Sequence, residues 1–159
     1  MLAENFKIVP ILSDLDLTTG ALMPGDSINM ARFHKATFIV GLQTLGGGDP
    51  TVAVYSGASD AAVTTIVPVK YAYGSAAAGA ANCDVLADWT DTSAVITIAH
   101  ASKDNFMLII EVDGAAMAAG HNWLTIQFAD PATTSTGNVQ VHAVLQSRFG
   151  ENQSVTALT

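Results

Sequence analysis

The chain of 159 residues contains a single cysteine, Cys83. An intramolecular disulfide is therefore excluded, and the fold must be stable through packing alone. Long apolar runs are also missing, because no stretch approaches the roughly 20 apolar residues that span a membrane as a helix. Glu4 stands where a secretory signal peptide would carry basic residues. These absences predict a protein that folds in the cytoplasm and is not exported by the general secretory route.

Charge is scarce as well: only 13% of the residues are charged, and 14 acids face 6 bases. Such a low fraction is typical either of a surface that partner subunits partly cover or of an exterior rich in Thr, Ser and Asn. Apart from Arg32 and Lys35, which lie close together with His34, the bases are scattered along the sequence. Nucleic-acid binding needs clustered Lys and Arg, so we expect no direct contact with DNA or RNA.

What the chain does contain is a repeated alternation of apolar and polar residues. The clearest case is the segment 105–128, where two apolar strands flank a connection of small residues. Further segments of this kind lie at 36–43, 51–55, 66–73, 94–98 and 138–149. A period of two residues is the pattern of β-strands, and no helix of ordinary length is indicated. About eight or nine strands at short spacing predict an all-β fold, an antiparallel β-sandwich of a jelly-roll-like kind.

Three parts of the chain can be separated on this pattern. Residues 1–33 carry mixed signals, since Pro10 confines a strand to a sheet edge and Pro24 and Gly25 punctuate an extended path. They are interpreted as an extended N-terminal arm or as a first hairpin packed on the chain's own sheet. Residues 34–149 form the β-sandwich domain, and the polar residues 150–159 are expected to be a mobile C-terminal tail.

Metal-binding residues occur without the spacing that a metal site needs. Asp14 and Asp16 have the spacing of some calcium loops, but the glycine and the distal glutamate of such a loop are missing. Turn formation is therefore the favoured role for both carboxylates. No motif joins the four histidines, which are His34, His100, His121 and His142. The sequence predicts no metal site and no cofactor.

Catalytic patterns are missing in the same way. No Gly-x-Ser-x-Gly elbow is present, and Gly46, Gly47 and Gly48 lack the partners of a phosphate-binding loop. Cys83 has no neighbouring base and is interpreted as a buried apolar residue. We expect a protein that is not an enzyme, unless the fold brings two or three of His34, His100, His121 and Asp88 into a buried cluster. The carboxylates interpreted as exposed turn residues are Asp88, Asp91 and Asp104.

Trp123 is the strongest candidate for a contact with another molecule. Leu124 and Ile126 belong to the apolar face of its strand, so alternation places Trp123 on the opposite face. An exposed tryptophan on a sheet marks a contact surface of some kind. Together with Trp89 it could form a platform on which a sugar stacks, but packing against a partner subunit is the favoured interpretation.

Several segments together resemble small β-rich structural proteins encoded in the head modules of tailed phages. They are NFMLIIEVD and HNWLTIQFADP around a small-residue link, the closing VQVHAVLQSRFG, and the earlier ATFIVGLQTLGG and TVAVYSGAS. The resemblance covers roughly residues 36–149. Proteins of this group resemble decoration, or cement, proteins, which sit as trimers on the outside of an assembled capsid and bridge neighbouring capsomers.

The resemblance implies a mechanical function in the virion, with the major capsid protein as partner and no catalytic residues. Residues 1–33 would then reach along the capsid or an adjacent subunit. The partner contacts expected on this basis are Phe6, Ile8, Arg32 and Trp123. Two alternatives stay open: a carbohydrate- or receptor-binding head-fibre module, and a self-assembling subunit of a tail or shell.

Overall fold

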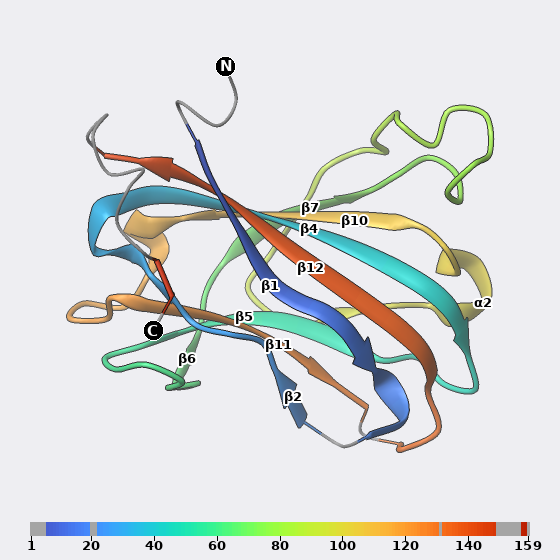
Figure 1. Ribbon diagram of the computed structural model, residues 1–159, viewed down its shortest axis with the longest axis horizontal. Coiled ribbons are helices and arrows are strands. Elements are labelled where there is room, and N and C mark those ends of the chain that lie inside the picture. The colour runs from blue at the N-terminus through green and yellow to red at the C-terminus, as the bar shows by residue number, and fades with distance from the viewer. Residues whose placement is uncertain (1–5, 20–21, 131, 149–156, 159) are drawn as a thin grey trace.

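A computed structural model describes residues 6–19, 22–130, 132–148 and 157–158 of the chain. Two antiparallel sheets of six strands pack face to face as a β-sandwich (Figure 1). Sheet I has the order β1 (Phe6–Asp16), β12 (Thr136–Ser147), β4 (Phe33–Gly46), β10 (Met107–Asp113), β7 (Val69–Tyr73) and β8 (Thr90–Thr92). Sheet II has the order β2 (Leu22–Pro24), β11 (Trp123–Ala129), β5 (Thr51–Gly57) and β6 (Thr65–Ile66). Two further strands belong to it: β3 (Ile28–Asn29) pairs with β11, and β9 (Ile96–Thr97) pairs with β5.

Helical structure is confined to short pieces within the described residues. The α-helix is α2 (His100–Lys103), a single turn. The 3₁₀ turns are η1 (Leu17–Thr19), η2 (Met30–Arg32) and η3 (Gly114–Ala116). Asn29 and Asp113 begin η2 and η3, and their side chains accept hydrogen bonds from the N–H groups of Ala31 and Ala115.

The predicted fold class is confirmed as an all-β sandwich, but the strand count of eight or nine was too low. Twelve strands lie in the described residues. Several strands are short: β2 and β8 have three residues, and β3, β6 and β9 have two. β9 lies in the predicted segment 94–98 and β6 overlaps the start of the segment 66–73, whereas β2 and β8 were not predicted. An alternation of apolar and polar residues is difficult to recognise over three residues.

The core lies between the two sheets. The pairing of β4 with β10 places Phe38 opposite Ile110 and Val40 opposite Leu108, and all four residues are 0% exposed. Phe128 of sheet II is equally buried. Because successive side chains of a strand point to opposite faces, the alternating apolar series fills the interior. Removing this apolar area from water, at about 25 cal/mol per Å², is the main force that holds the sheets together.

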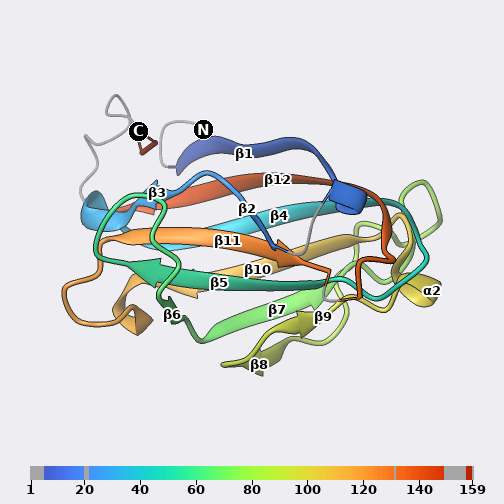
Figure 2. The ribbon, with the colours of Figure 1, turned by 90° about the horizontal axis from the view of Figure 1, so that it is seen from below.

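The N-terminal segment is part of this body from residue 6 onward. β1 pairs with β12 from Phe6 opposite Gln146 to Asp16 opposite Asn138, with irregular register around Leu12. Figure 2 shows these two strands side by side. Val9 and Ile11 belong to the same core cluster as the later strands, so residues 6–16 are an edge strand of the chain's own sheet and not a detached arm. Residues 1–5 lie outside the described residues.

The far end of the chain also contributes to the packing. Ala157 is 1% exposed, and its carbonyl oxygen accepts a hydrogen bond of 2.8 Å from the N–H of Asn29. Leu158 packs against the core cluster. The mobile tail expected over residues 150–159 therefore does not extend to these two residues. Residues 150–156 and 159 lie outside the described residues.

Phe38→Ala tests whether the inter-sheet core determines stability. The substitution leaves a cavity where β4 meets β10 and β12, and we expect the free energy of unfolding to fall by about 3–5 kcal/mol. Leu22→Ala is the control, because Leu22 is 67% exposed and should change the free energy by less than about 0.5 kcal/mol. Urea unfolding followed by tryptophan fluorescence measures both. Equal losses in the two variants would contradict this description of the core.

Candidate functional site

The histidines lie in separate environments. His34 belongs to β4, His142 to β12 and His100 to α2, while His121 lies in the loop before β11. Among the described residues, no three His, Cys, Asp or Glu side chains are grouped closely enough to hold a metal ion. No three of these histidines and Asp88 are therefore close enough to bind one ion within that part of the chain.

His121 is paired with a serine. The Oγ of Ser56 lies 2.9 Å from the Nδ1 of His121 and 3.5 Å from the carbonyl oxygen of Thr65. Ser56 is 0% exposed, so no substrate can reach its hydroxyl from solvent in this arrangement. The bond joins the loop before β11 to β5, and its role is to hold that loop.

His100 and Asp104 hold the glycine-rich loop 46–48. The Nδ1 of His100 lies 2.7 Å from the Oδ1 of Asp49, and the N–H of His100 donates to the same oxygen at 2.9 Å. The hydrogen bond from the His100 side chain is the main reason that the pKa of Asp49 lies below its ordinary value of 3.8, with the backbone bond second. Asp104 accepts a hydrogen bond of 2.7 Å from the N–H of Leu45.

The remaining carboxylates considered from the sequence also have local roles. Asp16 accepts hydrogen bonds from the hydroxyl and the N–H of Thr18, which lower its pKa. Asp14 accepts a hydrogen bond of 2.6 Å from Asn138 of the neighbouring strand. Asp91 forms an exposed ion pair with Lys70 at 3.6 Å. Cys83, expected to be buried, is half-buried in the loop between β7 and β8.

A more informative feature is the outer face of sheet I, the face turned away from sheet II. The strand registers align Pro10 with His142, His142 with Ile39, Ile39 with Ile109, and Ile109 with Ala72. Ile8 and Val144 stand beside this row, opposite each other. We refer to Ile8, Pro10, Ile39, Ile109 and Val144 as the apolar patch.

The apolar patch is unusual for the outer side of a sheet. A solvated outer face ordinarily carries polar side chains. Here Ile8 is 49% exposed, Pro10 is exposed, and Ile39 and Val144 are half-buried. Ile109 is 8% exposed, so the chain itself covers it. Exposed apolar side chains grouped on an outer face are typical of a contact surface.

The outer face of sheet II is different, because the chain covers it. The Oγ atoms of Ser27 and Thr125 are 2.8 Å apart, and the N–H of Ala61 donates to Ser27 at 3.0 Å. Thr125 is 0% exposed although it points away from the core. The loop that contains Ala61 thus shields this side, which leaves sheet I as the open face.

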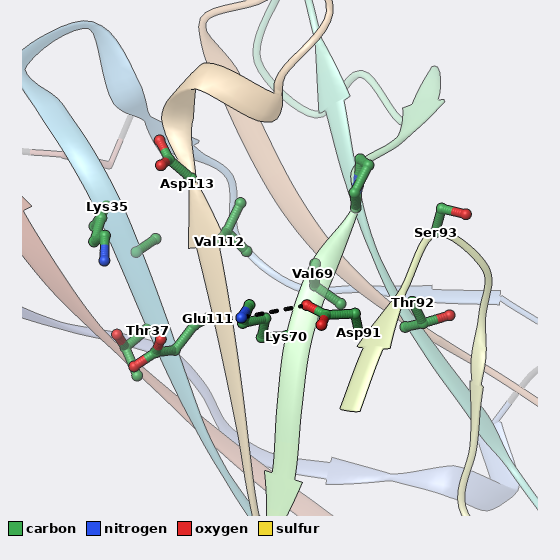
Figure 3. Close-up of a pocket in the computed structure, with 12 residues that line it drawn as sticks. Lys35, Thr37, Val69, Lys70, Asp91, Thr92, Ser93, Glu111, Val112 and Asp113 are labelled. Atoms are coloured by element: carbon green, nitrogen blue, oxygen red, sulfur yellow. Dashed lines mark ion pairs between the residues drawn. The ribbon is translucent and has the colours of Figure 1, made fainter. Parts of the chain in front are cut away.

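A groove adjoins the apolar patch on the same face, across β4, β10, β7 and β8 (Figure 3). Its volume is about 520 Å³. The registers align Thr37, Glu111, Lys70 and Asp91 in one row, and Lys35 with Asp113 in the next. The groove therefore presents ammonium, carboxylate and hydroxyl groups beside apolar surface that includes Pro68.

The contact residues expected from the sequence lie on both sides of the sandwich. Phe6 and Ile8 share β1, Phe6 half-buried and Ile8 exposed on the apolar patch. Arg32 is exposed at the end of η2. Trp123 lies on sheet II, opposite Gly57 and Asn29, and it is half-buried rather than fully exposed. The fold therefore brings Phe6 and Ile8 together and separates them from Trp123.

Sequence reasoning missed the centre of the patch, namely Ile39, Ile109 and Val144. Ile39 stands between Phe38 and Val40, and the other two also lie between apolar residues. Such continuous apolar runs are typical of strands that are covered on both faces. This signal, present in β4, β10 and β12, could have identified sheet I as the contact face.

Comparisons with known protein families, with curated proteins and with solved structures find no match to this chain. Within the described residues, no helix is both long and apolar enough to cross a membrane. The functional interpretation therefore rests on the geometry of sheet I and on the resemblance of the strand segments.

Titration of Asp49 tests the link between the glycine-rich loop and α2. Since the folded state favours the ionised carboxyl, Asp49 contributes stability that is present above its unfolded pKa, at about pH 4, and is lost as the pH falls through the lowered value. In His100→Ala, we expect the pKa of Asp49 to rise toward 3.8. Carboxyl NMR measures this value, and Asp16, held by Thr18, is the internal control. An unchanged Asp49 titration would show that His100 does not set it.

Proposed function

We propose that this chain is a structural protein of a tailed-phage virion. It binds the outside of the assembled capsid as a homotrimer and stabilises the shell by bridging neighbouring capsomers. The observation that carries the proposal is the apolar patch on the outer face of sheet I, the open face of the sandwich. The protein folds in the cytoplasm of the host bacterium and then attaches to the capsid surface.

The proposed contact with the capsid requires no catalytic residue in this chain. Ile8, Pro10 and Val144 present apolar area that gains about 25 cal/mol for each Å² removed from water. Charged residues around the patch, such as Glu111 and Lys35, form a polar rim that favours one orientation of the partner. Many modest contacts, repeated with the symmetry of the shell, give a bound layer that is much more stable than any single contact.

The pairing of the strands supports the proposal through the fold. β1 pairs with β12, β2 with β11, β4 with β10 and β5 with β6. The chain is thus one long hairpin wrapped into two sheets, with β7 and β8 added at the edge of sheet I. We infer a jelly roll from this order, an architecture that viral capsid and lectin domains use. Because a fold does not imply a function, this support is secondary to that of the patch.

Neither catalysis nor nucleic-acid binding is part of the proposal. The net charge is −8, which opposes contact with a phosphate backbone. Ser56, His121, His100 and Asp49, the groups closest to a catalytic pairing, hold loops in place. The protein is proposed to act without a cofactor.

The double variant Ile8→Ser/Ile39→Ser tests the apolar patch. Both side chains point outward, so the variant keeps the core while removing apolar contact area. We expect binding to capsids that lack this protein to weaken by at least about tenfold, or ~1.4 kcal/mol per contact. Co-sedimentation with capsids assembled from a tailed-phage major capsid protein measures occupancy.

Two control variants distinguish a capsid contact through sheet I from one through sheet II. Leu22→Ser removes an exposed apolar side chain from sheet II and should leave occupancy unchanged. Trp123→Ala tests the sheet II contact expected from the sequence. Full occupancy of the Ile8→Ser/Ile39→Ser variant, with loss in Trp123→Ala, would assign the contact to sheet II and overturn the role of the patch.

Light scattering after size exclusion tests the oligomer. A trimer has three times the chain mass of 16.4 kDa, about 49 kDa. A mass of about 16 kDa at micromolar concentration would contradict the proposed trimer in solution. Tubes or closed shells formed by the purified protein alone would instead favour a self-assembling tail or shell subunit.

A further inference from the structure

We propose that the groove on the outer face of sheet I is a binding site for a neutral saccharide. The groove borders the apolar patch, because Thr37 and Glu111 lie two residues from Ile39 and Ile109 on the same strands, β4 and β10. The inference does not require the capsid contact, since the free chain already presents the groove. The β8 side of the groove, with Asp91 and Ser93, lies farthest from β1 and β12.

The walls of the groove come from strands that are far apart in sequence. Figure 3 shows Glu111 of β10 and Lys70 of β7 side by side, with Asp91 of β8 joined to Lys70. Thr37 stands opposite Glu111 on the other side. Ser93, which follows β8, adds a hydroxyl group at the rim. The result is one row of donors and acceptors across four strands.

Most of these groups are available to a ligand. The side chains of Lys70 and Asp91 are 61% and 76% exposed, so the ion pair between them is weak. One carboxylate oxygen of Asp113 accepts the hydrogen bond that caps η3, and the other oxygen is available to a ligand. Among the described residues, no hydrogen bond or ion pair engages the side chains of Glu111 and Lys35. Glu111 is half-buried, so a ligand hydroxyl would reach a carboxylate that is already partly screened from water.

The chemistry of the lining excludes the other ligand classes. Three carboxylates against two ammonium groups oppose phosphates and other polyanions. A purely apolar ligand would leave the carboxylates and ammonium groups of the lining without partners. A metal ion lacks a group of three ligands among the described residues. A neutral polyhydroxylated molecule matches the set, because each hydroxyl can donate to a carboxylate and accept from an ammonium group.

Trp89 does not line the groove itself, but next to β8 it offers the stacking surface that saccharide sites commonly need. It stands two residues before Asp91 in the same extended segment, so alternation places it on the outer face. The segment follows β7 beyond β8, since the N–H of Ala87 donates to Tyr73 at 2.8 Å. Trp89 is 43% exposed, and an indole ring with one open face stacks on the apolar face of a sugar ring.

An NMR titration of the free full-length chain tests the site. The probes are maltose, cellobiose, lactose and chitobiose, each added to about 50 mM, because a shallow polar site for one disaccharide binds in the millimolar range. We expect amide shifts at Thr37, Lys70, Glu111 and Asp91, together with the indole N–H of Trp89, for at least one probe. Glu111→Ala and Trp89→Ala should each weaken the binding at least tenfold.

The controls separate the groove from the rest of the surface. Asp60→Ala removes an exposed carboxylate from the loop on the sheet II side, and Val85→Ala an exposed apolar side chain; neither should change the affinity. The proposal is overturned if no probe shifts these amides, or if Glu111→Ala and Trp89→Ala bind as the native chain does. Shifts caused by a lysine-rich peptide but by no saccharide would also overturn it, in favour of a peptide site. No outcome depends on capsid binding.

Discussion

The register of β4 against its two neighbours is the constraint on which the rest of this structure depends. In a sheet, a shift of one residue moves every side chain of a strand to the other face. β4 pairs with β12 and β10 over most of its length, which turns Phe38 and Val40 inward and Ile39 outward. The same register aligns Ile39 with Ile109 and Thr37 with Glu111. The core, the apolar patch and the groove are therefore three results of one set of backbone hydrogen bonds.

Sequence reasoning succeeded where a strand is long and has one apolar face. Leu124, Ile126 and Phe128 were expected to be core residues and are 0% exposed. It was less successful where contacts between distant parts of the chain determine strand pairing and burial. Pro10 suggested an arm or an edge, and only the pairing with β12 shows that residues 6–16 form an edge strand. Ala157 has no apolar pattern around it, so its burial against Asn29 could not be anticipated. Strands of two residues leave no pattern at all, because their position is set by the neighbours that they pair with.

For the surface residues too, the sequence predicted the face of the sheet but not the degree of exposure. The sequence places Trp123 on the outer side of its strand, as the fold does, but the degree of exposure depends on what lies above it. Ser27, Thr125 and the loop at Ala61 cover that side, and no periodicity could show this. On sheet I, the runs around Ile39 and Ile109 are typical of strands covered on both faces. Ile109 is 8% exposed within the chain itself, whereas Ile39 is half-buried. The proposed function needs no activated nucleophile, and the Ser56–His121 and His100–Asp49 pairs hold loops instead.

The position of β12 has a consequence for how the protein is made. β12 is the last strand of the described residues, yet it lies between β1 and β4, two of the first. Sheet I therefore cannot be completed on the ribosome before residues 136–147 have emerged from the exit tunnel. Until then β1 and β4 lack the strand that joins them, and their apolar faces depend on other molecules for shelter from aggregation. Contacts between such distant parts of the chain also make folding slow, on the scale of milliseconds to seconds. The pairing of β12 with β1 and β4 therefore completes sheet I after the other strands of that sheet have been made.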